Sequence, residues 1–146
     1  MNKNTVKVFL RIGLSLSFLS AVADRVGLWP KNISAWGNWA NFIDYTQTLN
    51  PYLPEFVISP LGYLVTILET FLGIFLLIGY KTELTAKISG YLLLLFALAM
   101  TFTGGIKGAL DYSVLTASAA AFSLSLFPIK YFELDLLLKK TTLNKD

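Results

Sequence analysis

The chain has 146 residues, of which 55% are hydrophobic and 14% are charged, and it contains no cysteine and no histidine. Soluble domains carry about 25% charged residues, so this composition predicts a single integral membrane domain, residues 1–146, rather than a soluble globular protein. It also excludes a dithiol relay and removes the usual protein ligands of haem, iron–sulfur clusters and zinc.

The first apolar run is expected to form a helix over residues 6–28, although three charged residues, Arg11, Asp24 and Arg25, interrupt it. Its basic start and the small residues of SAVAD are also typical of a secretory signal peptide cleaved before Asp24. We favour a retained spanning helix, because the charged residues lie near its ends, where long side chains reach the membrane interface.

The polar segment 29–54 follows, and its aromatic residues are Trp29, Trp36, Trp39, Phe42, Tyr45 and Tyr52. A short helix that Ser34 caps and Pro51 stops would place Trp36 and Trp39 on one face, as in an amphipathic segment lying on the bilayer. The simplest interpretation is an aromatic belt. The alternative is the mouth of a site for a flat lipophilic ligand.

Three further apolar runs are predicted to span the membrane at residues 57–80, 86–105 and 112–129, because each approaches the length of a bilayer core. The glycine-rich turn before the last run is expected to end one helix at Gly104 and Gly105, and Asp111 to cap the next. The predicted fold class is therefore an all-α integral membrane protein. It is a four-helix antiparallel bundle with an aromatic-rich extracytoplasmic loop or interfacial helix between helices 1 and 2.

Basic residues concentrate on one side of this topology. That side collects Lys3, Lys7, Arg11, Lys81, Lys87, Lys130, Lys139, Lys140 and Lys145. The other side keeps Arg25, Lys31 and Lys107. The positive-inside rule therefore predicts a multi-pass protein with both termini in the cytoplasm. These lysines also explain the basic pI as topology signals and contacts to anionic lipid, and no pattern indicates nucleic-acid binding.

Glu69 is the single ionisable residue of the apolar run from Leu64 to Gly79. An acidic side chain at the bilayer centre costs about 2.5–3.5 kcal/mol, so Glu69 is expected to face the bundle interior beside a cavity. Counting along the helices puts Arg25 ~15 Å away in depth and Arg11 ~10 Å from the middle of its helix. Glu69 is thus expected to lack a direct partner charge, to be largely protonated, and to handle protons or bind a ligand.

Small and polar residues share one face of each of the first two spanning helices. They are Gly13, Ser17, Ser20 and Asp24 in the first helix, and Gly62, Thr66, Glu69 and Gly73 in the second. Antiparallel packing along these faces would bring Ser17 and Ser20 to the depth of Glu69, and the glycines would permit close approach. The alternative to a functional Glu69 is therefore structural hydrogen bonding within this seam.

Three segments, FLRIGLSLSFLSAVADRVGLW, LETFLGIFLLIGYKTELTAKISGYLLLLFALAM and LDYSV, cover most of the chain and resemble the DoxX family. The resemblance implies a four-helix protein of the bacterial inner membrane, with Arg11 and Glu69 on the family's charged positions. Members are linked to quinone-dependent thiosulfate oxidation as a small subunit, and others to oxidative-stress complexes. The resemblance implies no catalytic mechanism.

Two classes of function follow, ahead of a transporter or proton path, for which the chain shows no inverted repeat. The first is a quinone-facing small subunit of a membrane oxidoreductase, non-autonomous and dependent on a partner subunit for electrons, with Glu69 as its catalytic residue. Its candidate ligand-binding or electrostatic residues are Arg11, Ser17, Ser20, Asp24, Arg25, Thr66, Trp36 and Trp39. The second is a non-enzymatic scaffold or assembly factor. No metal or covalent cofactor is expected, quinone is the candidate ligand, and a homo-oligomer stays open.

Overall fold

Residues 2–137 are described by a computed structural model, and every regular element within them is a helix, as the all-α prediction requires. The elements are α1 (Lys3–Arg25), α2 (Trp39–Leu49), α3 (Glu55–Ile78), α4 (Thr82–Gly104), α5 (Ile106–Asp111) and α6 (Val114–Ser125). The basic residues Lys139, Lys140 and Lys145, and the two ends of the predicted domain 1–146, lie outside the described residues.

Three of these helices are long and apolar enough to cross a membrane: α1, α3 and α4, with 23, 24 and 23 residues. The last helix, α6, is apolar but only 12 residues long, which is ~18 Å of helix against a bilayer core of about 30 Å. The predicted fourth helix over 112–129 therefore has the wrong bounds. Ser113 adopts a left-handed φ of 56° that separates α5 from α6, and α6 ends at Ser125.

Local chemistry explains most helix ends and corrects two predictions. Left-handed glycines, Gly79 with φ 71° and Gly105 with φ 84°, follow the ends of α3 and α4, where a side chain would be strained. The cap of α2 is Asn38, which accepts a hydrogen bond from the Asn41 N–H, and not Ser34. Asp111 is the last residue of α5 instead of the N-cap of the final helix.

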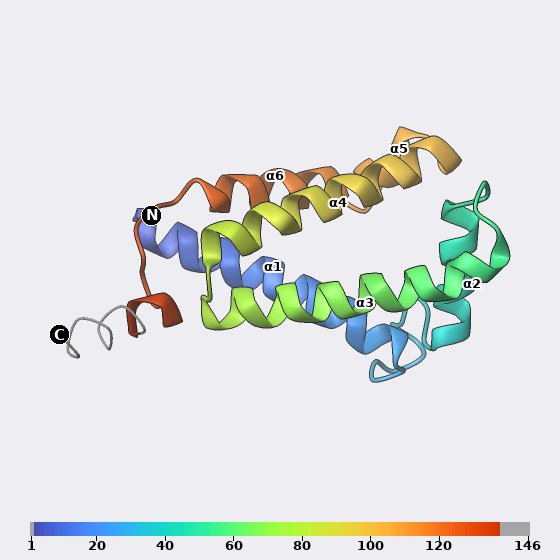
Figure 1. Cartoon of the computed structure of the whole chain (residues 1–146), viewed down its shortest axis with the longest axis horizontal. Coiled ribbons are helices and arrows are strands. Elements are labelled where there is room, and N and C mark those ends of the chain that lie inside the picture. The colour runs from blue at the N-terminus through green and yellow to red at the C-terminus, as the bar shows by residue number, and fades with distance from the viewer. Residues whose placement is uncertain (1, 138–146) are drawn as a thin grey trace.

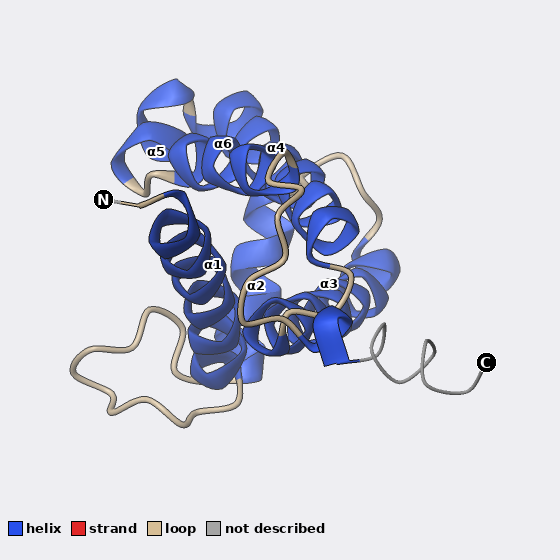
Figure 2. Cartoon of the chain, turned by 90° about the vertical axis from the view of Figure 1, so that its left-hand side faces the viewer, coloured by secondary structure: helices blue, strands red, loops and turns tan. Residues whose placement is uncertain are grey.

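The helices form two antiparallel pairs, α1 with α3 and α4 with α6 (Figure 1). The pairs meet in an apolar core made of Leu14, Phe18, Leu72, Leu76, Ala86, Leu92, Ala121 and Leu124. Beyond α6, residues 126–137, here called the strap, cross the end of the bundle from α6 toward α3 (Figure 2). We call this the strap end, and the opposite end, where α2 packs across α3, the α2 end (Figure 1).

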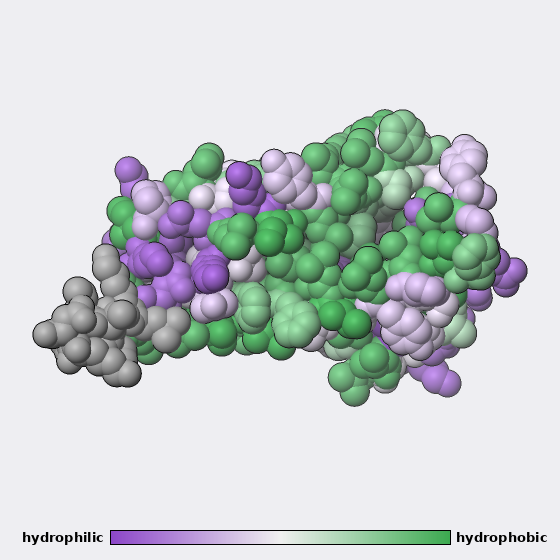
Figure 3. Space-filling view, viewed as in Figure 1, coloured by the Kyte–Doolittle hydropathy of each residue, from purple (hydrophilic) through white to green (hydrophobic). Residues whose placement is uncertain are grey.

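Large apolar side chains cover the outside of the three long helices. Exposed examples are Phe9, Leu16, Leu64, Ile67, Phe71, Ile88, Leu95 and Phe102. In Figure 3 the middle of the visible face is hydrophobic, and hydrophilic residues gather at the strap end. A soluble monomer rarely exposes so much contiguous apolar surface, so this surface is the one that a bilayer would cover.

The face of α1 that packs in the bundle differs from the predicted one. Its buried residues are Lys7, Arg11, Leu14, Ser15, Phe18, Asp24 and Arg25, whereas Gly13 and Ser17 are exposed. On α3, Gly73 does meet α1, since a Cβ there would lie 2.9 Å from Leu19. Gly62 faces α2 instead, where a Cβ would lie 2.5 Å from Ile43. The predicted stripe on α3 is therefore buried, but the matching stripe on α1 is turned away from it.

Replacing Gly73 with leucine is expected to lower the stability of the bundle by about 1–3 kcal/mol, because the new side chain would overlap Leu19 and Phe18. Gly13→Leu is the matched control, since a Cβ at Gly13 has no neighbour within 4 Å. Thermal unfolding of both variants in one detergent measures the difference. Equal losses at the two positions would contradict this rotation of α1.

Candidate functional site

Glu69 is paired with Arg25, and both side chains are only 3% exposed. The same Arg25 nitrogen, Nη1, donates to the Thr66 hydroxyl at 2.9 Å. The prediction that Arg25 lies too far from Glu69 is wrong because it assumed the wrong register. Ser15 Oγ donates to the Gly73 carbonyl at 2.8 Å, and this register puts Arg25 ~9 Å along the helix axis from Glu69, within reach of a bent arginine.

Aromatic rings enclose this ion pair from the α2 side. The Arg25 guanidinium carbon lies 4.1 Å from the centre of the Phe42 ring and 5.3 Å from that of Trp36. A cation over an aromatic face is attracted by the ring's charge distribution, so the rings both cover and stabilise Arg25. Trp39 does not join the pair. It stacks on Tyr63 at 4.4 Å and packs against Phe42, which holds α2 on α3.

Asp24 organises the loop that carries Trp36. Its carboxylate accepts a hydrogen bond from the Ser34 hydroxyl and three from the backbone N–H groups of Ala35, Trp36 and Gly37, at 2.9, 3.1 and 3.2 Å. Four donors satisfy both oxygens of an acidic group at the end of α1. The predicted electrostatic partner of Glu69 is therefore a loop anchor.

An open hollow of about 380 Å³ lies beside this loop, lined by α1 residues and by Trp29, Ile33, Ala35 and Trp36. Ser17, Ser20, Ala21 and Asp24 form its α1 wall. The expected hydrogen bonds from Ser17 and Ser20 to Glu69 are absent from the described residues. Ser17 donates to the Gly13 carbonyl, and Ser20 accepts from Trp29 Nε1 at 3.1 Å. Trp36 contacts both regions, since it lines the hollow and lies over Arg25.

Arg11 belongs to a second buried cluster at the strap end. Lys7 Nζ lies 2.6 Å from Glu133 and donates to the carbonyls of Phe127 and Ile129 at 3.0 and 2.7 Å. Arg11 lies 3.8 Å from the same carboxylate and donates to the Tyr131 carbonyl at 3.3 Å. Two cations thus satisfy the non-helical backbone of the strap. Arg11 and Arg25 are fourteen residues apart, ~21 Å along α1, so Arg11 is not brought to Glu69.

A partly exposed ion pair joins two residues of the strap, Lys130 and Asp135. Lys130 Nζ lies 2.9 Å from Asp135, and this hydrogen bond raises the pKa of Lys130 above its usual value. Burial alone would raise the pKa of Asp135, but the hydrogen bonds from the Lys81 N–H and from Lys130 outweigh it, and the pKa falls below its usual value. Both groups are therefore charged near neutral pH.

Sequence reasoning missed Lys7, Glu133 and Phe42. One signal for Lys7 was available: Lys7, Arg11, Leu14, Phe18 and Arg25 follow steps of four, three, four and seven, which place them on one helix face. Glu133 gave no such signal, because it lies in a non-helical segment far along the chain. Among the described residues, no group of three or more acidic, histidine or cysteine side chains is arranged to hold a metal ion.

Comparisons with protein families, with curated proteins and with solved structures returned no match for this chain.

Arg25→Gln and Glu69→Gln are each expected to destabilise the fold by about 3–5 kcal/mol, because each leaves one buried charge without its partner. The double variant should recover most of that loss, since two neutral amides replace the two charges. Thermal unfolding of the four proteins in detergent measures the coupling.

The exposed pair of Lys107 and Asp111, at 82% and 57% exposure, is the matched control. There a single substitution should change stability by about 0–1 kcal/mol. Additive losses in the double variant of Arg25 and Glu69 would contradict the ion pair.

Proposed function

We propose that the protein is a DoxX-like, quinone-facing small subunit of an oxidoreductase in the bacterial cytoplasmic membrane. The observation that carries this proposal is the hollow beside α1, which Trp29 and Trp36 line together with Ser17 and Ser20. Aromatic walls suit a flat apolar ring, and the Ser20 hydroxyl, which accepts from Trp29 Nε1, keeps its own proton to donate to a carbonyl oxygen of a quinone. The electrons come from a partner subunit, because the chain has no cysteine or histidine for redox chemistry of its own.

In this proposal Glu69 acts on the quinone from behind Trp36. The Arg25 guanidinium lies over Trp36, and Glu69 is its counterion, so the pair sets the electrostatic potential of one wall of the hollow. Glu69 is also the only carboxylate within α3 beyond its first turn, which keeps it the candidate for proton transfer. Reduction of a quinone takes up two protons, and a buried acid beside the site would shorten their route.

A second proposal, a non-enzymatic scaffold or assembly factor, is favoured by a different observation. The cations buried in α1 find their partners within the chain: Arg25 pairs with Glu69, and Lys7 and Arg11 with Glu133. Charges that are already paired and enclosed stabilise one packing of the helices. In this proposal these residues serve only to stabilise the bundle, and a partner protein recognises the outer surface of the bundle.

We propose further that the chain crosses the membrane four times, with α5 and α6 together forming the last crossing and the strap end in the cytoplasm. In the described residues the strap end carries six basic residues and three acidic ones: Lys3, Lys7, Arg11, Lys81, Lys87 and Lys130 against Glu83, Glu133 and Asp135. The α2 end carries three basic and four acidic residues: Arg25, Lys31 and Lys107 against Asp24, Asp44, Glu55 and Asp111. The count of basic residues, six against three, supports this orientation.

The orientation predicts which positions a reagent outside the cell can reach, and the cysteine-free chain suits the test. Single cysteines at Lys31 and Lys107 should react with a membrane-impermeant maleimide on intact cells. A cysteine at Lys87 should react only after lysis. Labelling of the cysteine at position 87 on intact cells would contradict the proposed orientation.

Filling the hollow is expected to block quinone binding. Ser17→Phe should weaken binding of a short-chain quinone at least tenfold, because the ring would occupy the space between α1 and Trp29. Ser123→Phe, at an exposed position of α6, is the control. Quenching of tryptophan fluorescence measures binding, since all three tryptophans lie in the segment 29–39. Equal quinone affinity in the two variants would show that the quinone does not bind in the hollow.

The role of Glu69 is tested by measuring quinone reduction in the protein purified together with its partner subunit. The double variant of Arg25 and Glu69 to glutamine keeps the hydrogen-bonding shape and removes the titratable proton. Loss of quinone reduction with intact assembly is the result expected of a quinone-linked subunit. Full activity of the double variant would show that Glu69 is not catalytic and would favour the scaffold proposal.

A further inference from the structure

The strap has two different sides. Its inner side is polar: its carbonyl groups accept from Lys7 and Arg11, and the Glu133 side chain is 1% exposed. Its outer side carries the exposed apolar side chains of Leu126, Ile129, Phe132 and Leu136 beside the ion pair of Lys130 and Asp135. The strap therefore attaches to the bundle through its polar groups and turns its apolar side chains outward.

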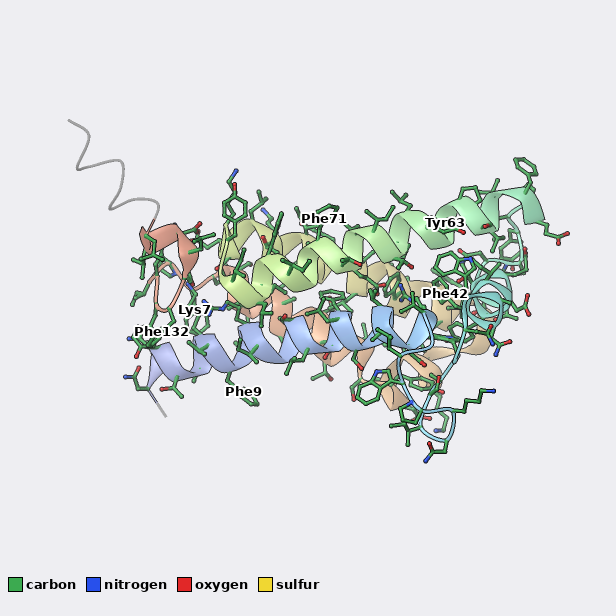
Figure 4. All side chains as sticks on the ribbon, turned by 90° about the horizontal axis from the view of Figure 1, so that it is seen from below. Lys7, Phe9, Phe42, Tyr63, Phe71 and Phe132 are labelled. Carbon is green, nitrogen blue, oxygen red and sulfur yellow. The ribbon has the colours of Figure 1, made fainter. Side chains whose placement is uncertain are left out.

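The backbone conformation at Phe132 also holds an apolar side chain on the outside of the strap. Phe132 has a left-handed φ of 50°, a conformation that bulky residues rarely adopt, and its side chain is 72% exposed. Its ring meets that of Tyr131 edge to face at 4.7 Å. A strained turn that holds an aromatic ring outside the fold indicates a contact beyond the chain itself. Figure 4 places Phe132 at the same end of the molecule as Lys7.

The depth of the strap identifies the surroundings of these side chains. Lys7 and Arg11, which hold the strap, lie four and eight residues into α1, ~6 and ~12 Å from its first residue. Since α1 is ~34 Å long, a hydrocarbon core of about 30 Å begins within its first turn, so Lys7 and Arg11 lie in the outermost part of that core. The strap that they bind crosses the end of the bundle, at the boundary between headgroups and hydrocarbon. Aromatic and aliphatic side chains favour that boundary.

The charge at this end selects the kind of lipid. Lys3, Lys81 and Lys87 are exposed, and none of them is in an ion pair within the described residues. Their positive charge complements an anionic headgroup, and such attraction is strongest where apolar anchoring holds the lysines at the surface. The α2 end, with its excess of acidic residues, lacks this complementarity.

We infer that the strap and the neighbouring turn between α3 and α4 form a binding surface for anionic phospholipid, anchored in the bilayer by Phe132. The occupant is the membrane leaflet at the strap end, and the bound lipid stabilises the bundle by holding the strap closed over Lys7 and Arg11. The quinone proposal does not enter this inference.

Nanodiscs of phosphatidylcholine, with and without phosphatidylglycerol, test the lipid preference. Both faces of a nanodisc see the same lipids, so the result does not depend on topology. Phosphatidylglycerol should raise the unfolding midpoint of the full chain, and Lys81→Gln with Lys87→Gln should remove more than half of that rise. The matched pair Lys31→Gln with Lys107→Gln, at the α2 end, should retain it. An equal rise in both double variants would overturn the inference.

A second measurement tests the anchor. In Phe132→Trp, the additional fluorescence over the native tryptophans should be quenched by brominated phosphatidylglycerol. Quenching by aqueous iodide alone would place the residue in water and overturn the anchor. Loss of bromine quenching only when a soluble acidic protein is added would identify a protein partner in place of lipid, and would equally overturn it.

Discussion

The ion pair of Arg25 and Glu69 is the interaction on which the α2 end depends. A carboxylate in the middle of α3 is costly in a bilayer unless it is paired, and Arg25 supplies the partner from the last residue of α1. The pair fixes α1 against α3 at a point where α1 ends and the chain turns away. Its guanidinium then offers a surface on which Phe42 and Trp36 lie, and this contact adds to the stacking of Trp39 on Tyr63 in holding α2 against α3.

The neighbouring Asp24 extends this dependence into the loop. A negative charge at a helix C-terminus is unfavourable, because it faces the negative end of the helix dipole. Three backbone N–H groups and a hydroxyl compensate for it, and in doing so they set the conformation of residues 34–37. Consecutive charges of opposite sign thus do different work: Arg25 joins α1 to α3, and Asp24 folds the loop back over the pair. The hollow between α1 and Trp29 results from that return of the chain.

The sequence could predict the long apolar helices and the interior position of Glu69, because hydrophobic length and the cost of a buried charge are local properties. It could not predict the rotation of α1. Small residues at Gly13 and Ser17 suggested close packing, but Lys7, Arg11 and Arg25 take the buried face, because a charge left unpaired in a bilayer is costly. The sequence also could not predict how short α6 is. At its start the left-handed Ser113 separates α6 from α5, and past its end the chain continues as the strap, whose Phe127 carbonyl accepts a hydrogen bond from Lys7 of α1.

The arrangement of polar groups also bears on what the protein can do. Between the cluster at Arg11 and the pair at Arg25, the seam of α1 and α3 is filled by Leu14, Phe18, Leu72 and Leu76. In the described residues these apolar side chains separate the two charged regions, which does not favour a proton or ion path along the seam. Because the charges are paired internally, a ligand in the hollow meets the pair of Arg25 and Glu69 only across Trp36, which lies over Arg25. The groups left free to meet a ligand are aromatic rings and hydroxyls, and such groups position a molecule while its partner supplies the chemistry.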